Sequence, residues 1–350
     1  MSKKSKIIII IPSYNGRQHL VELLPDLVKE DYQDFDLQIL VVDNNSSDGS
    51  AEYIQNHYPQ IELIINQENT GYVGANNIGY QYAKRQTADF IYLLNQDTLI
   101  TPGFLQPLHD FARDNKFGSL QSKLLLHPDK QKINSLGNVI HYLGFGYSQG
   151  CQKEDQANQE IGQINYASGA GVLISMQALE DLGGLFDETM FMYLEDLDLG
   201  WSLTLLGHQN YLIPDSVIYH KYEFDRGMKQ VYWFERNRLW LLCKNYKLLT
   251  LLFLFPAWCL MEIGQLFFAW RHKYLKQKIK SYSWIFEASQ WKILIRKRRF
   301  IQDKRVVNDR LVLKEFSGKI LFQPLESTIL NIANEIFDTY FLIIRFFIIW

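Results

Sequence analysis

Short apolar runs alternate with amphipathic segments over residues 6–94, and this alternation restricts the possible folds more than any other feature of the sequence. Four runs rich in β-branched and aliphatic residues predict buried strands over 6–11, 37–42, 61–65 and 88–94. Between them, apolar residues at helical spacing predict helices over 18–30 and 74–85. Strands that alternate with helices form a mainly parallel sheet through right-handed crossovers. The predicted fold class is therefore α/β, with a Rossmann-like, mostly parallel sheet and flanking helices.

The beginning of the chain is similar to a signal peptide, because lysines precede five isoleucines. The apolar run is too short for that role and ends at Pro12, so we interpret it as the first buried strand.

Three cysteines, Cys151, Cys243 and Cys259, lie far apart without metal-ligand spacing. They indicate a reducing compartment and no disulfide framework.

Charge divides the chain into two regions. Residues 1–220 carry 13 Lys and Arg against 27 Asp and Glu, whereas residues 221–350 carry 23 against 11. An acidic domain needs a cation to hold a diphosphate, and a basic region suits an anionic membrane surface or nucleic acid. We predict a catalytic domain over residues 1–222 and a helical, basic and aromatic region over residues 223–350.

Residues 248–270 are apolar for long enough to span a bilayer. Pro256, Glu262 and Gln265 make a re-entrant or interfacial arrangement an equal alternative. Residues 271–310 hold 13 Lys and Arg, three acids and scattered Tyr, Trp and Phe, a pattern typical of segments at the lipid headgroup layer. Membrane lipids are therefore the expected partner of this region, and nucleic acid is not. A last apolar segment, residues 336–350, is too short to span alone.

Two acidic sites stand about a hundred residues apart. Asp43 and Asp97 each follow a predicted strand, and ligands bind beyond the carboxyl ends of strands in parallel sheets. Glu195 and Asp196 open a predicted helix that ends at Gly207, where the helix dipole keeps a carboxylate ionised. Structural alternatives remain: an Asx turn at Asp43, a capped turn at Asp97 before a helix beginning at Thr101-Pro102, and an acidic first turn at Asp196. The placement favours group transfer from a nucleotide-activated donor.

Six motifs in order resemble the inverting family 2 glycosyltransferases of GT-A fold, and among them most closely the bacterial rhamnosyltransferases of cell-surface polysaccharide synthesis. The motifs are Ile11–Gly16, Val41–Gly49, Asn69–Asn77, Leu94–Asp97, Phe191–Leu199 and Ile218–His220. The series covers residues 7–220. Glu235–Arg238 and the basic stretch at Arg296–Arg299 are also similar to the tail of that group.

The resemblance implies a role for each motif. Inverting transfer needs a base for the acceptor hydroxyl and positive charge on the leaving diphosphate. By resemblance, Asp196 is the base and Glu195 orients the acceptor. Asp97 and His220 hold a divalent cation, Mg²⁺ or Mn²⁺. Asp43 accepts a hydrogen bond from uracil or thymine in a pocket walled by Pro12, Ser13, Tyr14 and Asn15. The donor site extends to Asn45, Asn69, Gly71, Asn76 and Asn95.

Two positions depart from the family pattern. Asn95 stands where many relatives have an acid, which weakens metal binding or leaves Asn95 to contact ribose or phosphate. Ser202 follows Trp201 where relatives often carry Arg. For Arg236 and Arg238 two interpretations stay open: contact with a lipid diphosphate, or a solvated helix face.

The resulting functional hypothesis is an inverting hexosyltransferase at the cytoplasmic side of the cell membrane, attached peripherally, by a re-entrant segment or by a single span. It moves rhamnose from dTDP-rhamnose to a lipid-linked or polysaccharide acceptor. The alternatives are a UDP-sugar donor, or a non-catalytic membrane-tethered scaffold that binds nucleotide sugar. A nucleotidyltransferase would have a glycine- and Lys/Arg-rich loop near the N-terminus, and a dehydrogenase would have G-x-G-x-x-G after the first strand; both are absent.

Overall fold

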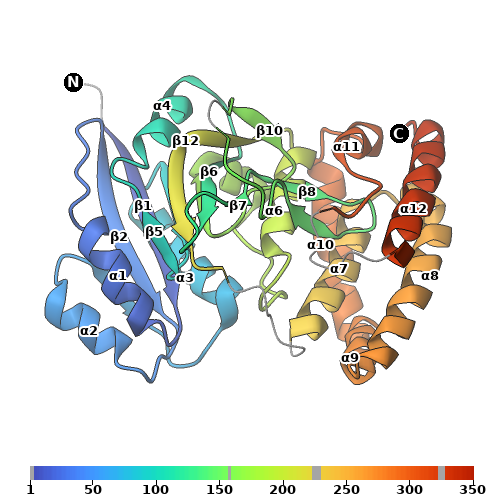
Figure 1. The fold of residues 1–350 in the computed structure, drawn as a ribbon, viewed down its shortest axis with the longest axis horizontal. Coiled ribbons are helices and arrows are strands. Elements are labelled where there is room, and N and C mark those ends of the chain that lie inside the picture. The colour runs from blue at the N-terminus through green and yellow to red at the C-terminus, as the bar shows by residue number, and fades with distance from the viewer. Residues whose placement is uncertain (1–3, 157–158, 223–229, 322–327) are drawn as a thin grey trace. The chain divides into compact units, whose positions relative to one another are not determined.

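The structure is a computed structural model that describes residues 4–156, 159–222, 230–321 and 328–350 (Figure 1). The chain divides into two compact units. The first contains residues 1–138, 148–203 and 208–222, and the second contains residues 139–147, 204–207 and 223–350.

The first unit begins with the predicted alternation of strands and helices. Its elements up to residue 94 are β1 (Ser5–Ser13), α1 (Arg17–Leu27), β2 (Phe35–Asp43), α2 (Ser50–His57), β3 (Glu62–Ile65), α3 (Gly71–Arg85) and β4 (Phe90–Leu94). β1 pairs in parallel with β2 and β4, and β2 pairs in parallel with β3. The predicted parallel α/β arrangement is confirmed for this part of the chain.

Antiparallel strands extend the sheet beyond β4. The further elements are β5 (Thr98–Ile100), α4 (Gln106–Asp114), β6 (Ser119–Leu126), β7 (Ile133–Ser135), β10 (Gly162–Ile164), β11 (Gly171–Ser175), α5 (Met176–Leu182), α6 (Glu195–Leu205) and β12 (Asn210–His220). β8 (Asn138–Ile140) and β9 (Gly146–Ser148) form a separate two-stranded sheet, mostly in the second unit. The strand order is β10-β12-β6-β11-β4-β1-β2-β3, with β5 on β12 and β7 on β6. β11 runs antiparallel to both neighbours, β4 and β6, whereas β12 and β6 are parallel. The sheet is thus mixed: β11 lies between the parallel strands β4, β1, β2 and β3 on one side and the parallel pair β6 and β12 on the other.

The predicted helix start at Thr101-Pro102 is wrong. Residues 98–100 form β5, which pairs with β12, and the Thr101 hydroxyl donates to the Val217 carbonyl. α4 begins later, at Gln106, with Pro107 in its first turn. Pairing with a distant strand therefore overrides the local Thr-Pro signal.

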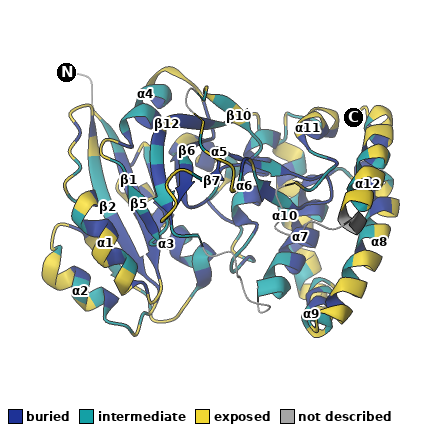
Figure 2. Ribbon diagram, in the orientation of Figure 1, coloured by how far each residue is buried: buried dark blue, intermediate teal, exposed yellow. Residues whose placement is uncertain are grey.

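The main core of the first unit lies between one face of the sheet and the helices α1 and α4. Its isoleucines and leucines from β1 and α1 are fully buried, including Ile7, Ile9, Leu20 and Leu24 (Figure 2). Gly79 of α3 packs directly on β1: a Cβ there would lie 2.4 Å from Cγ2 of Ile10. This close contact seats α3, which carries part of the candidate site, against the sheet.

The second unit is mainly helical among the residues that the structure describes. Its helices are α7 (Val231–Asn245), α8 (Leu248–Arg271), α9 (Leu275–Ile285), α10 (Ala288–Lys304), α11 (Asp309–Glu315) and α12 (Thr328–Phe347). α7 packs on α9 and α10, and α8 packs on α9 and α12. By length and composition alone, α8 is able to cross a membrane.

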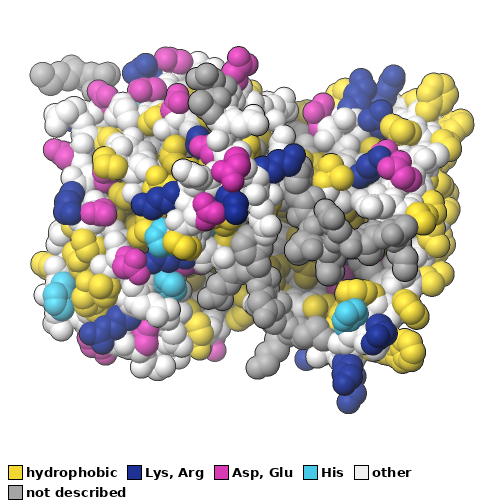
Figure 3. Space-filling model, viewed as in Figure 1, with side chains coloured by type: hydrophobic (Ala, Val, Ile, Leu, Met, Phe, Trp, Pro, Cys, Tyr) yellow, Lys and Arg dark blue, Asp and Glu magenta, His cyan; other side chains and the backbone are white. Residues whose placement is uncertain are grey.

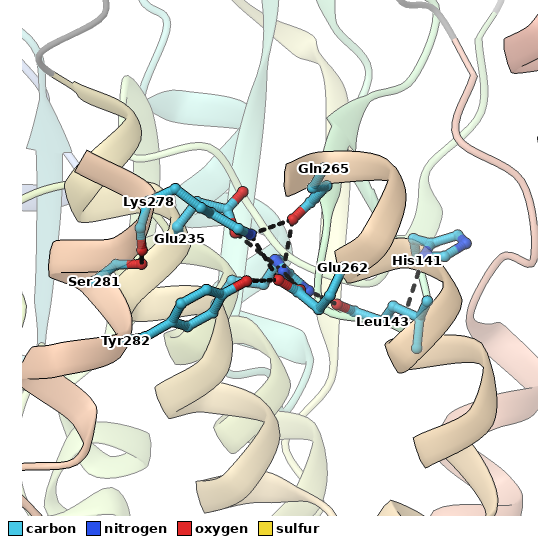
Figure 4. Close-up of polar contacts among 9 residues, drawn as sticks. His141, Leu143, Glu235, Glu262, Gln265, Lys278, Ser281 and Tyr282 are labelled. Atoms are coloured by element: carbon cyan, nitrogen blue, oxygen red, sulfur yellow. Dashed lines mark hydrogen bonds and ion pairs between the residues drawn. The ribbon is translucent and has the colours of Figure 1, made fainter. Parts of the chain in front are cut away.

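A buried cluster of charges joins α7, α8 and α9 (Figure 4). Arg238, fully buried, forms ion pairs with Glu235 at 3.0 Å and with Glu262 of α8. Lys278 of α9 pairs with the same two carboxylates, 2.7 Å from Glu262. Both open interpretations of Arg238 are therefore wrong, because its guanidinium faces neither solvent nor a lipid headgroup.

Arg236 is also buried, and its guanidinium lies over the rings of Trp233 and Trp284 at 4.4 and 4.2 Å. Cation–π contacts therefore hold this side chain inside the helical unit. A solvated helix face is the wrong interpretation here too.

Candidate active site

Asp43 ends β2 in a buried position with one unused carboxylate oxygen. Its Oδ1 accepts from the Ser46 backbone N–H at 2.9 Å, which closes the turn predicted at this point. Its Oδ2 is buried and has no hydrogen-bond partner among the described residues. A buried carboxylate oxygen without a donor is costly, so this atom is suited to a ligand N–H, such as that of a uracil or thymine ring.

The loop after β1 lies beside this turn. Pro12 and Ser13 are buried, whereas Tyr14 is 48% exposed. Asn15, at φ 47°, bridges the two loops: its N–H donates to Ser46 Oγ, and its Oδ1 accepts from the Ser47 N–H at 2.8 Å. Asn15 therefore links the two loops, and the Tyr14 ring is exposed beside them.

Gln96, which follows β4, forms hydrogen bonds with the loop after β1. Its Oε1 accepts from the Ser13 hydroxyl at 2.9 Å and from the Tyr14 N–H at 3.1 Å. Gly16 is needed because a Cβ there would lie 1.9 Å from this amide oxygen. Asn95, adjacent to Gln96, has a buried Oδ1 without a partner among the described residues, so it is a further candidate ligand contact.

Asn44 connects the Asp43 turn to the loop before α3. Its Nδ2 donates to Asn69 Oδ1 and to the Gly71 carbonyl, and its Oδ1 accepts from the Thr70 N–H and from Asn66 Nδ2. Asn45, exposed at φ 66°, turns outward beside it. The predicted site residue Asn69 is thus held in place by an amide that the sequence analysis did not assign.

Gly71 permits a close contact at the start of α3. It has φ 75°, and a Cβ would lie 2.4 Å from the Phe191 carbonyl oxygen, which accepts from the Val73 N–H at 3.2 Å. The residues before α6 are therefore held against α3. Asn76 is fully buried in α3: its Nδ2 donates to the Tyr72 carbonyl, whereas its buried Oδ1 has no hydrogen-bond partner among the described residues.

Asp97 and His220 come together through strand pairing. The β5–β12 register places His220 opposite Thr98, and the Lys221 N–H donates to the Asp97 carbonyl at 2.9 Å. His220 Nε2 lies 3.4 Å from Asp97 Oδ1, and His220 Nδ1 lies 2.9 Å from Asn134 Oδ1. Burial alone raises the pKa of Asp97, but the hydrogen bond and charge of His220 outweigh burial and lower that pKa.

This pair has the donor atoms of a divalent cation site. Asn134 accepts the Nδ1 proton, which is how a second residue orients a histidine ligand, so Nε2 is left facing Asp97. Among the described residues no group of three or more His, Cys, Asp or Glu side chains gathers as a metal site. One carboxylate and one imidazole suit a cation that takes its remaining ligands from phosphate and water, as Mg²⁺ usually does.

Glu195 and Asp196 begin α6, as predicted, directly after two residues in the left-handed conformation, Tyr193 and Leu194. Asp196 is partly exposed and Glu195 is 8% exposed. The Gly169 N–H lies 3.5 Å from Asp196 Oδ2, and the Leu197 N–H donates to Oδ1 at 2.8 Å. Asp196 is therefore the more accessible carboxylate of the two.

Ser202 is buried in the same helix, so position 202 presents no side chain at the surface.

The pKa of Tyr72, in the first turn of α3, responds to the charges of both acidic sites. Burial raises its pKa well above the ordinary value, and the charges of Glu195, Asp196 and Asp97 raise it further. Its hydroxyl donates to the Gly169 carbonyl at 2.8 Å. Burial and these charges keep Tyr72 protonated, so its hydroxyl acts as a hydrogen-bond donor.

Substitution of Asp43 by Asn tests the base pocket. The introduced amide would retain an acceptor for Ser46 but would remove the charge and turn its own NH₂ group toward the ligand N–H. We expect binding of dTDP or UDP to weaken by about 10- to 100-fold, since hydrogen bonds to charged groups contribute about 1.5–3 kcal/mol. Isothermal titration calorimetry with each nucleotide measures the change.

Asp36→Asn is the matched control, because Asp36 lies on the same strand but is exposed. Equal affinities of the Asp43 and Asp36 variants would show that Asp43 only shapes the turn.

The mixed sheet and the acidic groups at its strand ends define a glycosyltransferase of GT-A fold. The chain belongs to the family described as glycosyl transferase family 2, whose model matches residues 8–183. The family and fold class predicted from the motifs are therefore confirmed.

A relative in Mycobacterium tuberculosis, N-acetylglucosaminyl-diphospho-decaprenol L-rhamnosyltransferase, is 25% identical over 234 residues, which are 61% of this chain and 75% of the relative. Among solved structures, Staphylococcus aureus TarS 1–349 in complex with UDP has a TM-score of 0.51 at 14% identity and covers 97% of this chain and 90% of that one. The mannosyltransferase PcManGT from Pyrobaculum calidifontis, with GDP-Man and Mn²⁺, has a TM-score of 0.51 at 16% identity and covers 87% of each chain. The structural matches show the fold alone.

Proposed function

We propose that this glycosyltransferase moves rhamnose from dTDP-rhamnose to a lipid-linked or polysaccharide acceptor, with inversion, at the cytoplasmic face of the cell membrane. Residues 1–222 would be the catalytic domain and residues 223–350 the membrane-associated region. The proposal is supported by two observations: His220 Nε2 lies 3.4 Å from Asp97 Oδ1, and the buried Oδ2 of Asp43 has no hydrogen-bond partner among the described residues. The rhamnosyltransferase relative supports the choice of sugar.

The donor base would lie between the loop after β1 and the turn after β2. Asp43 Oδ2 would accept the ring N–H, which uracil and thymine have and cytosine lacks at that position. The Tyr14 ring would cover the base, and Asn45 and Asn69 would contact the nucleoside. The side-chain amide of Asn95 would form a hydrogen bond with the ribose or a phosphate. Gly71 and Asn76 would act by fixing the start of α3.

Asp97 and His220 would hold Mg²⁺ or Mn²⁺ at the diphosphate. A cation held there would supply positive charge to the leaving group. The structure of PcManGT with GDP-Man and Mn²⁺ agrees with such a cofactor in this fold.

Asp196 would take the proton of the acceptor hydroxyl while the acceptor oxygen bonds to the anomeric carbon. The bond from that carbon to the diphosphate oxygen breaks on the opposite face, and the nucleoside diphosphate leaves. Glu195 would orient the acceptor, and the hydroxyl of Tyr72, kept protonated by its surroundings, would hold the Gly169 loop beside the base. The α6 dipole favours the ionised form of Asp196 before the transfer.

A UDP-sugar donor is the second candidate, and the UDP complex of TarS favours it. Asp43 does not separate uracil from thymine, because both rings present the same N–H. A scaffold that binds nucleotide sugar without turnover is the remaining alternative.

A thermal-shift screen tests the proposal. Detergent-solubilised protein is heated with dTDP, UDP, GDP or CDP, each with Mn²⁺ or with EDTA. A ligand at 100 times its dissociation constant contributes about 2.7 kcal/mol of stability. We expect a clear rise in Tm with dTDP and Mn²⁺, a smaller one with UDP, and loss of both in EDTA. A shift with GDP or CDP alone would contradict the proposed recognition of uracil or thymine by Asp43. No shift with any nucleotide would contradict the proposed donor site and would mean that the chain shares the fold of glycosyltransferases without binding a nucleotide.

A further inference from the structure

Exposed apolar side chains are concentrated in the second unit. Among the described residues, all but four of the exposed large hydrophobic side chains lie there, and the four exceptions are Tyr14, Val21, Ile65 and Ile161. Nine lie on α8, and seven more lie on α12 and the end of the chain. Figure 2 shows the exposed residues along both helices, and Figure 3 shows hydrophobic side chains along the edge where these helices lie. An apolar patch of this extent marks an interaction site.

The structure describes every residue of α8, and the exposed face of this helix has no hydrogen-bonding side chain before its last turn. Its exposed positions include Leu248, Leu252, Phe255, Ile263 and Phe267. The polar residues of the helix face the protein instead: Thr250 donates to Asp309 at 2.5 Å, Gln265 accepts from Arg238 at 3.1 Å, and Glu262 is in the buried charge cluster. A protein partner normally requires hydrogen bonds across an interface, and this face of α8 offers none.

α12 continues the same surface. Its inner side is apolar at Phe337, Phe341 and Ile344, which are buried. The exposed positions of its first half include Glu335 and Thr339, whereas those of its second half, such as Ile343 and Phe346, are apolar. A helix end on a water-facing surface would have a polar outer side. α8 and α12 pack together, and the Tyr340 hydroxyl donates to the Phe253 carbonyl at 2.7 Å. α8 and the second half of α12 thus present one apolar face.

Polar contacts at two places, one near the start of α8 and one in its second half, hold the helix against the rest of the second unit. Near its beginning, Thr250 is bonded to Asp309, which also pairs with Arg305 at 2.5 Å. Near its end, Glu262 pairs with Arg238 and Lys278. About 22 Å of helix separates Thr250 from Gln265. If α8 crossed a bilayer, the charged groups that hold it would lie at the depth of the hydrocarbon, which is costly for each ion.

Basic and aromatic side chains stand at the end of the apolar face. Trp270 is 64% exposed, and Arg271, His272, Lys273, Lys276 and Lys280 follow it as exposed residues. Figure 3 shows Lys and Arg side chains gathered at that end of the helical unit. Each Lys or Arg near an anionic leaflet contributes about 1 kcal/mol of attraction, and Trp prefers the interface itself.

We propose that α8 and α12 lie in the plane of one leaflet of an anionic bilayer, with their shared apolar face among the acyl chains and the basic end of α8 at the headgroups. α8 is then an interfacial helix and does not span the membrane. The inference rests on the membrane association in the proposed function and specifies its form, and it does not depend on which sugar is transferred.

Vesicle binding by the full chain is the first test. We expect co-sedimentation with vesicles of phosphatidylcholine and phosphatidylglycerol (7:3), and weaker binding to phosphatidylcholine alone and at high salt. The double variant Ile263→Asp/Phe267→Asp should weaken binding to the anionic vesicles at least about 10-fold, because two carboxylates would enter the acyl region. Ile161→Asp, at a position of similar exposure in the first unit, should bind as the wild type does.

The orientation of α8 is tested by labelling single cysteines. In a background with Cys151, Cys243 and Cys259 replaced by Ala, Lys247→Cys and His272→Cys mark the two ends of the helix. We expect an impermeant maleimide to label both positions in inverted vesicles and neither in intact cells. Labelling of the two positions from opposite sides would overturn the in-plane arrangement and show a span.

Two further outcomes would also overturn the proposal. One is unchanged vesicle binding by the double Asp variant. The other is that this variant converts a dimer to a monomer without affecting vesicle binding, which would make the apolar face a contact between two copies of the chain. The nucleotide thermal shift of the same variants should equal that of the wild type, so failure of membrane docking is distinguishable from failure of the donor site.

Discussion

Asp196→Asn should lower kcat by about 10²- to 10⁴-fold, the usual contribution of a general base, with nucleotide affinity nearly unchanged. The amide is isosteric and still accepts from the Leu197 N–H, which the carboxylate does at 2.8 Å, so the start of α6 should keep its structure. Only the ability to take the acceptor proton is lost. The measurement is transfer from dTDP-rhamnose to a lipid diphosphate sugar acceptor, with the Tm shift by dTDP and Mn²⁺ as the binding readout.

Glu188→Gln is the control for this experiment. Glu188 is exposed in the segment before α6, so its substitution removes the same charge from the same region without changing the base. We expect activity close to that of the wild type. Wild-type turnover by Asp196→Asn would show that another group is the base, and equal losses in both variants would point to a general charge effect.

Arg238→Met should destabilise the helical unit by about 3–5 kcal/mol, because it leaves two buried carboxylates with one remaining cation. Glu235 and Glu262 both pair with Arg238, which also donates to the Leu143 carbonyl at 3.2 Å. A loss of this size lowers Tm by about 10 °C in a unit of this scale. Differential scanning fluorimetry in detergent measures it.

Two comparison variants make this result specific. Arg238→Met/Glu262→Gln should recover part of the lost Tm, because one of the two carboxylates becomes neutral. Lys29→Met breaks an ion pair with Asp26 whose side chains are 71% and 63% exposed, and it should change stability by less than about 1 kcal/mol. A Tm for Arg238→Met equal to that of Lys29→Met would show that the cluster contributes nothing to the fold.

The sequence was sufficient to predict the elements whose signals are local. β1, β2 and β4 are apolar runs with turn residues after them, and their ends carry Asp43 and Asp97 as predicted. The start of α6 at Glu195 and its end before Gly207 were also predicted correctly. Each of these features depends on residues within a few positions of one another.

Features that depend on distant pairing were missed. β5 has only three residues and exists because β12 pairs with it, so the Thr101-Pro102 signal misled the prediction of α4. The antiparallel course of β11 follows from its two neighbours and not from its own residues. Periodicity gives no information on which strand lies beside which.

In the candidate site too, residues with local sequence signals were predicted, and residues whose roles depend on distant contacts were missed. Asp43, Asp97 and Asp196 were found by their positions, but Asn44, Tyr72 and Gln96 were not, although all three lie within the quoted motifs. Their roles are contacts: the Asn44 side chain forms hydrogen bonds with four residues of the 66–71 loop, and Gln96 forms hydrogen bonds with the loop at Ser13. Arg238 was misjudged for a related reason, since a charge in a basic region is usually solvated and only the partners Glu235 and Glu262 permit its burial.

The pairing of Asp97 with His220 also bears on how the enzyme is made. The base pocket uses β1, β2 and the start of α3, all translated early, whereas Asp97 receives its histidine only when β12 has joined β6. At about 5–20 residues per second, ribosomes complete β12 several seconds or more after residue 97 has been added. A nascent chain therefore has the residues of the proposed nucleotide pocket before it has those of the proposed diphosphate site, and a truncation before residue 220 would leave Asp97 without its histidine.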